Sequence, residues 1–182
     1  LTGKVNFSGK LSMTFPYHVA QCPVYYNHMN TGRPKPGEDY KGSYVSMYVD
    51  IPNAPLFPYG YGLSYSEFAV SPVKLSSDKM ERGGKITVSA EVTNLSDVDG
   101  EETVQLYIRD LYASRVRPVK ELKGYEKVFV KAGETVNVEM EIDENMLKFW
   151  DENMEFTAEN GEFEVFLGTD SDTENKAKFI LA

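Results

Sequence analysis

The sequence predicts a mainly β fold, and three observations support this prediction. Apolar residues alternate with polar ones in several short segments after residue 69, clusters of turn-forming residues separate these segments, and no long segment has helical periodicity. Alternation with a period of two is typical of antiparallel strands that cover a core with one face and meet water with the other.

The expected strands follow one another at short intervals. The first contains Val70, Val73 and Leu75 and is interrupted by Pro72, which suits an edge strand. Clear alternation then occurs over residues 86–92, 104–108, 136–142, 163–167 and 177–181. Turn signals lie at residues 83–84, 94–97, 132–133, 160–161 and 170–172. One short helix-like piece, residues 144–149, predicts a single turn.

About seven short strands in residues 69–182 predict a β-sandwich of the immunoglobulin or fibronectin III type. The chain has one cysteine, Cys22, so the cysteine pair typical of antibody domains is absent and the fibronectin-like variant is favoured. The prediction is therefore a mainly β chain that ends in a complete β-sandwich.

The first 50 residues have little regular pattern and are rich in Tyr, Pro, Gly and Asn. We expect short strands at residues 11–15, 24–26 and 44–50 and an exposed loop at residues 30–39. A loop-rich stretch of this length does not close a core alone. It therefore needs a partner surface.

Residues 56–68 combine aromatic residues with two glycines and one proline, and they match neither a helix nor a strand period. Glycines allow sharp backbone turns, and aromatic rings bury large surfaces. We expect this segment, called the strap below, to be irregular and heavily buried where two domains meet.

The charge of the chain excludes several partners. The formal net charge is −9 and no basic block occurs, which argues against nucleic acid and anionic membranes. The sequence has no run of about 18 apolar residues, so no segment is predicted to span a membrane. The chain starts at Leu1 without an initiator Met or signal peptide, so we expect a piece of a longer polypeptide.

Several motifs together resemble glycoside hydrolase family 3, the β-glucosidase and β-xylosidase family, and most closely its periplasmic bacterial β-glucosidases. The strap is similar to the junction motif of that family. In the same order as in the family, the chain carries similar motifs at residues 8–16, 23–28, 31–34, 104–110, 117–124, 131–135 and 161–165. Departures from the family pattern occur at Ser12, Cys22, Met47 and Tyr59. Relatives often carry Arg in place of Met47, so the details of the substrate subsites stay open.

The resemblance implies two parts. Residues 1–68 would be the tail of the second catalytic domain, an α/β sandwich, together with the strap, and residues 69–182 a fibronectin type III-like domain. The family hydrolyses terminal β-linked glucose, or xylose, with retention, through an Asp nucleophile and a Glu acid/base. Both belong to segments outside this chain. We therefore expect no catalytic residue, no cofactor and no metal here, and an inactive chain with a structural role.

The resemblance also implies partners and a compartment. The expected partners are the parent's own catalytic domains and, through them, a β-glucoside or oligosaccharide substrate; a homodimer of the parent stays open. A periplasmic or secreted parent is favoured, and a cytoplasmic one stays open. The alternatives are a carbohydrate-binding or adhesive fibronectin-like module and a free-standing hydrolase.

Three acidic pairs are catalytic candidates by proximity, but strand ends and turns favour solvated surface; they are 101–102, 143–144 and 151–152. Asp170, Asp172 and Glu174 alternate as in a calcium loop but lack its Gly and terminal Glu, which favours a solvated turn. Two histidines, His18 and His28, are too few for a metal site.

Several further positions allow both a structural and a functional interpretation. Cys22 is most simply a small buried hydrophobe, with a catalytic thiol beside His18 or His28 as the alternative. His28 either hydrogen-bonds within the tail beside Tyr26 or lines the substrate pocket. Met47 is a second residue that could border this pocket. Trp150 is expected in the core or a domain contact, with sugar stacking as the alternative. The basic residues Arg109, Arg115, Arg117, Lys120 and Lys123 either dock on acidic patches or balance charge.

Overall fold

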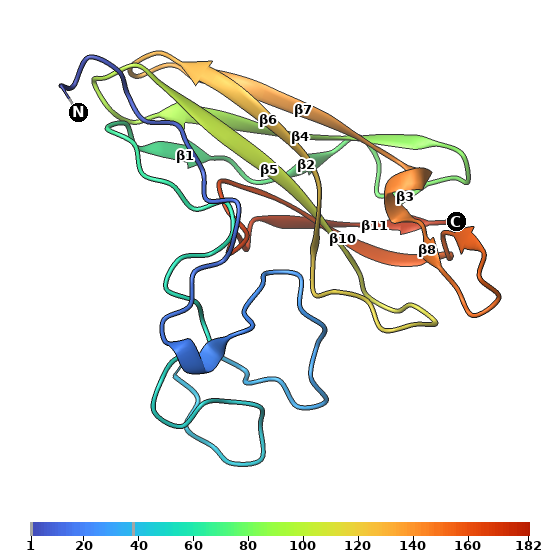
Figure 1. Ribbon diagram of the computed structural model, residues 1–182. Helices are drawn as coiled ribbons and strands as arrows, with labels where there is room; N and C mark the ends of the chain where they lie inside the picture. The colour runs from blue at the N-terminus through green and yellow to red at the C-terminus, as the bar shows by residue number, and fades with distance from the viewer. Residues whose placement is uncertain (1, 38) are drawn as a thin grey trace.

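Two sheets pack face to face in the computed structural model, which describes residues 2–37 and 39–182 (Figure 1). In the first sheet, β4 (Lys85–Asn94) pairs with β7 (Thr135–Asp143) along one edge and with the short β1 (Phe68–Val70) and β2 (Lys74–Leu75) along the other. The second sheet has the order β3 (Lys79–Met80), β11 (Lys176–Leu181), β10 (Gly161–Gly168), β5 (Gly100–Asp110) and β6 (Glu121–Val130).

Three small elements complete the described fold. A two-stranded hairpin consists of β8 (Phe149–Trp150) and β9 (Phe156–Thr157). The 3-10 helix η2 (Glu144–Leu147) follows β7 and confirms the single turn expected there. A second 3-10 helix, η1 (Val19–Gln21), lies among the loops of the first part of the chain. The mainly β sandwich predicted from the alternation is confirmed.

The core lies between the two sheets and contains the residues that the alternation selects. Along β4 the apolar positions are buried and the intervening positions are half-buried or exposed, as expected for a strand with one face on a core. The buried members contributed by the five clearly alternating segments include Ile86, Val88, Ala90, Val92, Val104, Leu106, Ile108, Val138, Ile142, Phe163, Val165, Leu167, Phe179 and Leu181.

Part of the second face of β5 and β10 does not meet water, which the alternation did not predict. Gln105 and Tyr107 on β5 and Glu164 and Phe166 on β10 are all buried, although they point away from the core side chains between them. The first part of the chain covers Gln105 and Tyr107, through Gly60 and Tyr26. Lys176 pairs with Glu164, and Lys120 lies over the ring of Phe166. We call these four residues the covered face. A period-two pattern identifies the core side of a strand, and it does not show which remote segment covers the other side.

Residues 2–67 run along the sandwich, form a lobe of loops below it in the view of Figure 1, and return as the strap to β1. Residues 11–15 lie antiparallel to residues 56–61, with Leu11 N–H donating to Tyr61 O at 2.8 Å and Phe15 N–H to Phe57 O at 2.9 Å. The strand expected at residues 11–15 is reduced to a single bridge between Phe15 and Phe57.

The strands expected at residues 24–26 and 44–50 are wrong. In the second segment only Ser46 forms a bridge, with Pro34, and Tyr44 has a φ of +66°, which breaks an extended run. The loop at residues 30–39 is exposed over most of its described positions, as expected. Glu38 lies outside the described residues.

Candidate functional site

The contact between residues 2–67 and the covered face is the most elaborate side-chain arrangement outside the core. Its centre is a chain of three rings. Tyr26 lies edge-on to Tyr107 at a centroid distance of 5.6 Å and packs on Tyr59 of the strap at 4.7 Å. Leu122 N–H donates to the hydroxyl oxygen of Tyr26 at 3.2 Å. Burial raises the pKa values of Tyr26 and Tyr107, so both phenols stay neutral donors and acceptors.

The strap is joined to the sheet beside these rings by backbone carbonyls. Gln105 Nε2 donates to Gly60 O at 3.3 Å and to Thr169 O at 2.7 Å, while Tyr107 Oη donates to Gln105 Oε1 at 2.5 Å. Ser171 N–H donates to Tyr59 O at 2.9 Å. Gly60 has a φ of +80°, and a Cβ there would overlap the amide of Gln105. Glycine is therefore required where the strap meets β5.

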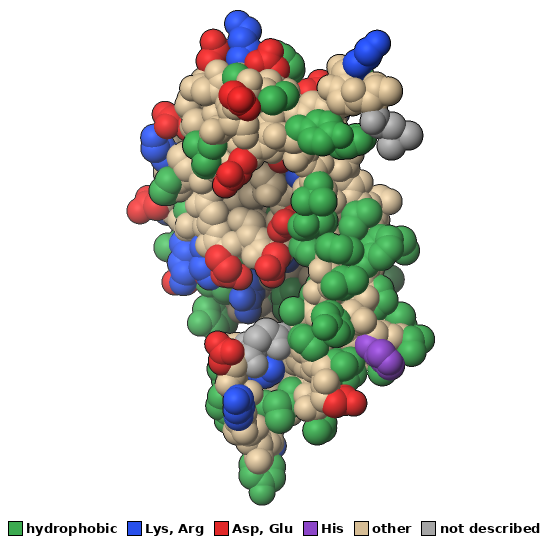
Figure 2. Space-filling view, turned by 90° about the vertical axis from the view of Figure 1, so that its left-hand side faces the viewer, with side chains coloured by type: hydrophobic (Ala, Val, Ile, Leu, Met, Phe, Trp, Pro, Cys, Tyr) green, Lys and Arg blue, Asp and Glu red, His purple; other side chains and the backbone are tan. Residues whose placement is uncertain are grey.

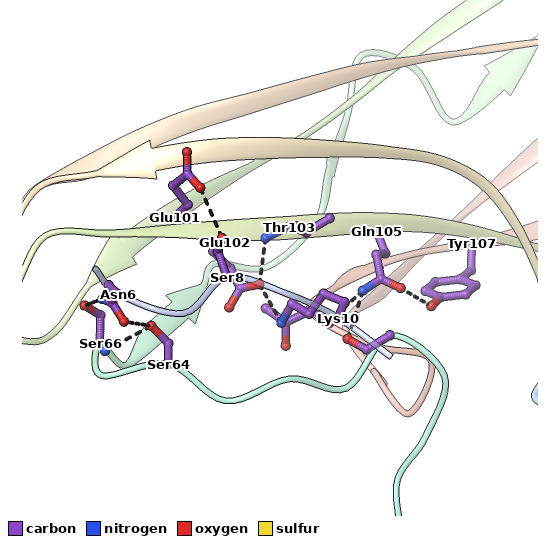
Figure 3. A network of polar contacts seen from close by, with 12 residues as sticks. Asn6, Ser8, Lys10, Ser64, Ser66, Glu101, Glu102, Thr103, Gln105 and Tyr107 are labelled. Atoms are coloured by element: carbon purple, nitrogen blue, oxygen red, sulfur yellow. Dashed lines mark hydrogen bonds and ion pairs between the residues drawn. The ribbon is translucent and has the colours of Figure 1, made fainter. Parts of the chain in front are cut away.

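A polar network fixes the start of the chain to the far end of the strap and to β5 (Figure 3). Asn6 Nδ2 donates to Ser66 Oγ at 2.8 Å, and Asn6 Oδ1 accepts from Ser64 Oγ and from Tyr65 N–H. Lys10 Nζ lies 2.6 Å from Glu102 Oε1, with side-chain exposures of only 15% and 9%. Charge-assisted contacts of low exposure are stronger than those in open solvent.

Lys120 ties the loop between β10 and β11 to the start of β6. Its ammonium donates to Ser171 O at 2.9 Å and to Thr173 O at 3.1 Å, and it lies 4.4 Å from the centre of the Phe166 ring. Burial lowers the pKa of Lys120, and the carboxylates of Glu174, Asp172 and Asp170 oppose this effect.

Two cavities flank this contact. The first, of about 340 Å³, lies between the first part of the chain and the sheet, and the second, of about 560 Å³, lies within residues 21–53. Val24, Tyr25, His28 and Asn53 line both cavities. Met47 lines the second one. Both positions for which a pocket role was left open thus border a cavity of this chain.

His28 does not bond within the tail alone. Its backbone carbonyl accepts from Val119 N–H at 3.0 Å, and the neighbouring Met29 forms a bridge with Pro118. Its ring Nδ1 lies 2.9 Å from Met29 O. The Tyr26 hydroxyl and the His28 carbonyl therefore bond to residues 122 and 119, outside the tail, whereas the His28 ring bonds within the tail.

The acidic pairs differ from the solvated surface expected of them in one member. Glu102 is buried, because Lys10 and its own neighbour Thr103 N–H, at 2.7 Å, hold its carboxylate. The reading of Glu102 as solvated is wrong. Asp143 instead caps η2, and hydrogen bonds from Gly83 N–H and Arg82 lower the pKa of Glu144.

The third pair lies in the β8–β9 turn. Glu155 N–H and Asn153 N–H donate to Asp151 and lower its pKa, and Glu152 lies 3.1 Å from Arg115. The carboxylates of all three pairs are therefore engaged in structural contacts within the chain, and those of Glu101 are with Lys127 and Ser8.

The acidic residues at 170, 172 and 174 are arranged as a turn. Asp172 N–H donates to Asp170 Oδ1 at 2.9 Å, and burial raises the pKa of Asp170. Within the described part of the chain, His, Cys, Asp and Glu side chains form no group of three placed to hold a metal ion.

The expected burial of Cys22 and the core position considered for Trp150 are wrong, whereas a domain contact of Trp150 stays a prediction. Cys22 is exposed rather than buried. Trp150 is 60% exposed and contacts the ring of Phe156 across the β8–β9 hairpin at 5.3 Å, so it is not part of the core. Both errors arise because the sequence does not show whether a single residue outside a periodic pattern is buried or exposed.

The basic residues have partners within the chain. Arg109 lies 3.8 Å from Glu164, and Arg117 and Lys123 lie 2.6 and 3.5 Å from Glu121. The guanidinium of Arg117 also stacks on the Phe149 ring at 4.4 Å. With Arg115 on Glu152 and Lys120 on carbonyl oxygens, these contacts favour internal charge balance over docking.

Sequence reasoning missed the residues that join the two parts, namely Asn6, Lys10, Gln105 and Tyr107. Their partners lie far away in the chain, which no local pattern reveals. One signal was available: Gln105 and Tyr107 occupy polar-face positions of a strand, and a tyrosine there indicates a covered rather than a solvated face.

Comparisons with known proteins agree with the fold and the motifs. A family model described as the fibronectin type III-like domain matches residues 102–171. The chain is 50% identical over 181 residues to the periplasmic beta-glucosidase of Salmonella typhimurium, which covers 100% of this chain and 24% of that relative. It is 40% identical over 179 residues to a putative beta-xylosidase of Formosa agariphila, covering 98% of this chain and 22% of the relative.

A solved structure shows the same arrangement. The beta-glucosidase of Listeria innocua in complex with isofagomine matches with a TM-score of 0.93 and 43% identity, over 100% of this chain and 25% of that one. The chain thus spans about a quarter of the length of the relatives it matches. The resemblance to part of a family 3 β-glucosidase and the fibronectin type III-like sandwich are confirmed, whereas the domain division at residue 68 stays a prediction.

Proposed function

We propose that this chain is the C-terminal part of a retaining β-glucosidase and that it supports the catalytic domains of that enzyme without taking part in bond cleavage. Residues 1–68 would end the second catalytic domain and carry the strap, and residues 69–182 would form the supporting sandwich. The parent would remove terminal β-linked glucose, or xylose, from oligosaccharides and glycosides, with its Asp and Glu outside this chain.

One observation carries this proposal, namely the distribution of apolar side chains. Among the described residues, no buried hydrophobic residue of the core lies before Met80. Exposed large hydrophobic residues occur throughout residues 5–65, among them Val5, Phe7, Phe15, Val19, Leu56 and Leu63. Hydrophobic side chains gather in a band on the face that carries this part of the chain (Figure 2). A surface of this kind marks a contact with a further protein surface.

Partial burial of the strap fits the same view. Phe57 and Tyr61 stack at 4.9 Å and are half-buried, whereas Leu63 and Tyr65 are exposed. The strap is therefore less buried in this chain than expected from its sequence. Its outer side would complete its burial against the catalytic domains.

The proposal is tested by comparing this chain with the longer polypeptide of the parent gene, using a nitrophenyl β-glucoside. We expect turnover only by the longer polypeptide. Turnover by the 182-residue chain would contradict the proposal, and so would an inactive longer polypeptide that is folded.

A carbohydrate-binding module is the second candidate, because Trp150 is exposed and an exposed Trp can stack on a sugar ring. Affinity electrophoresis of the chain on polysaccharide gels separates the two functions. A supporting domain migrates unretarded, and a binding module is retarded through Trp150.

The partners and the compartment follow from the same proposal. The catalytic domains of the parent would be the protein partner, with a homodimer of the parent as a further contact. The name of the Salmonella relative supports a periplasmic parent. Within the described residues, no helix has both the length and the apolar character to cross a membrane.

A further inference from the structure

The outer faces of the two sheets differ in chemistry. On the first sheet, the outward-facing positions of β4 and β7 are all polar or charged, namely Lys85, Thr87, Ser89, Glu91, Thr93, Thr135, Asn137, Glu139 and Glu141. On the second sheet, the outward-facing positions of β6 include Tyr125 and Phe129, which are 71% and 55% exposed. A polar face is stable in water, whereas aromatic side chains gathered on one face indicate a contact with another protein surface.

The direction of these two rings follows from the alternation along β6. Val130 is buried in the core and Val128 packs against it, so Phe129, Lys127 and Tyr125 face the other way. Among the described strands, β6 is the last of its sheet and pairs with β5 alone. Its aromatic side chains therefore stand at the border of the sheet, next to the covered face.

The covered face continues directly into these aromatic positions. Tyr125 lies opposite Gln105 in the ladder between β5 and β6, and Phe129 lies opposite Glu101. The first part of the chain already contacts the β5 member of each pair, because Gln105 bonds to the strap and Glu101 accepts from Ser8 Oγ at 3.1 Å (Figure 3). Tyr125 and Phe129 therefore extend an existing contact by one strand.

A polar bridge connects this surface to the hydrophobic band of the first part of the chain. Lys127 Nζ lies 2.8 Å from Glu101 Oε2, the oxygen that also accepts from Ser8. Phe7, the neighbour of Ser8 in the chain, packs its ring on Tyr65 at 5.2 Å, and both rings are exposed. Exposed aromatic side chains therefore lie on both sides of one short polar bridge.

The area of the β6 surface is too small to hold a second copy of the chain. One aromatic side chain buries about 150–250 Å², so two of them supply less than about 500 Å². A stable association between separate proteins needs about 800 Å² from each partner. A surface of this size adds to a contact that other residues already hold, which favours a neighbour within the same polypeptide.

From these observations we propose that Tyr125 and Phe129 form a direct contact between the sandwich and the catalytic domain that ends in residues 1–68. This inference rests on the function proposed above and extends it, because the sandwich itself would bind that domain in addition to the lobe and the strap. The facing surface would be apolar at its centre, with a polar group at its border that reaches Glu101 or Lys127. The polar outer face of β4 and β7 would stay in water.

Cysteine accessibility in the longer polypeptide tests this contact. Phe129→Cys is compared with Glu139→Cys, an exposed position on the polar face of β7, in a background where Cys22→Ser removes the exposed thiol of this chain. Peptide mass spectrometry measures maleimide labelling at each position. In the longer polypeptide, we expect labelling at position 129 to be at least about tenfold slower than at position 139. In the 182-residue chain the two rates should be similar, because both positions are exposed there.

Hydroxyl-radical footprinting of the unchanged proteins provides a second measurement, which does not depend on a substitution in the contact. Oxidation of the Tyr125 and Phe129 rings should be slower in the longer polypeptide than in the 182-residue chain. Equal oxidation of these rings in the two proteins would overturn the inference.

Leu63→Cys separates this inference from the proposed function, because Leu63 belongs to the exposed hydrophobic residues of the strap. Protection of position 63 without protection of position 129, in a longer polypeptide that turns over the nitrophenyl β-glucoside, would overturn the contact at β6 and leave the proposed function standing. Labelling at both positions would contradict both. Protection of position 129 that increases with the concentration of the 182-residue chain would show a second copy on β6 and refute the contact with the catalytic domain.

Discussion

Gln105 on β5 donates through its side-chain amide to the backbone carbonyl of Gly60 in the strap, at 3.3 Å. The same amide nitrogen donates to Thr169 O at 2.7 Å, so one side chain connects three segments that are distant in the sequence. Gly60 allows this contact through a φ of +80° and through its lack of a side chain. A residue with a Cβ would be strained at this φ, and its Cβ would displace the Gln105 amide.

Gly60→Ala should therefore lower the free energy of unfolding by about 2 kcal/mol or more, from backbone strain and displacement of the Gln105 amide. Urea denaturation followed by circular dichroism measures this change. Gly9→Ala is the matched control, because a Cβ at Gly9 meets no atom within 4 Å and its φ is not positive. Equal losses in the two variants would show that the position of the glycine is unimportant.

Lys10→Met should cost about 2–3 kcal/mol of stability, because it leaves the carboxylate of Glu102 buried without its cation. The double variant Lys10→Met with Glu102→Gln should recover part of this loss, since no buried charge remains. Chemical denaturation of the single and double variants gives the coupling energy.

Lys79→Met is the control for that series, because the Lys79–Glu81 pair has side-chain exposures of 55% and 71%. We expect a change of about 0–1 kcal/mol there. A loss at Lys10 no larger than at Lys79 would mean that the first segment is not held by its ion pair.

The dependence of stability on pH should change with opposite sign in two carboxylate variants. Burial raises the folded-state pKa of Asp170 above 3.8, so its contribution to stability is present below that pH and is lost as the pH rises through the raised pKa. Asp170→Asn removes this loss. Its stability relative to the unchanged chain should rise as the pH is raised from about 3 to 7.

Asp151 provides the opposite case, because hydrogen bonds from Glu155 N–H and Asn153 N–H lower its pKa below 3.8. Its contribution is present above pH 3.8 and is lost as the pH falls through the lowered pKa. The loss of unfolding free energy caused by Asp151→Asn should therefore become smaller as the pH falls. Denaturation curves across this pH range test both signs, and parallel profiles for the two variants would contradict the burial of Asp170.

On the function proposed above, Phe57→Ala should lower the free energy of unfolding more in the longer polypeptide than in this chain. Phe57 stacks on Tyr61 but is only half-buried here. We expect a loss of about 1–2 kcal/mol in the 182-residue chain, and of about 3–5 kcal/mol in the longer enzyme, where the ring would be covered completely. Melting temperatures and denaturation midpoints of both proteins measure the difference. Equal losses would argue against a catalytic-domain surface over the strap.

The sandwich could be predicted because its strands repeat a simple physical pattern. Ile86 to Val92 and Phe163 to Leu167 place every second side chain in the core, and the glycines at 83 and 133 adopt the positive φ that their turns require. These features depend on neighbours in the sequence. They remain visible without any tertiary information.

The contact region could not be predicted in the same way. The burial of Glu102 depends on Lys10, and that of Tyr107 depends on Tyr26, in each case through a partner remote in the sequence. The strap was expected to be heavily buried where two domains meet, because aromatic rings bury large surfaces. Leu63 and Tyr65 are instead exposed, since hydrophobic composition does not specify which surface covers a side chain.

Strand β5 lies between two layers, with Val104, Leu106 and Ile108 toward the core and Gln105 and Tyr107 beneath the docked loops. Its peptide groups are thereby shielded from solvent on both sides, so deuterium should reach them later than those of β6 at the border of the same sheet. Motion of the loops would therefore affect β5 before the other strands. A force applied through the first segment would act on β5, between β10 and β6, rather than on a strand at the edge of the sheet.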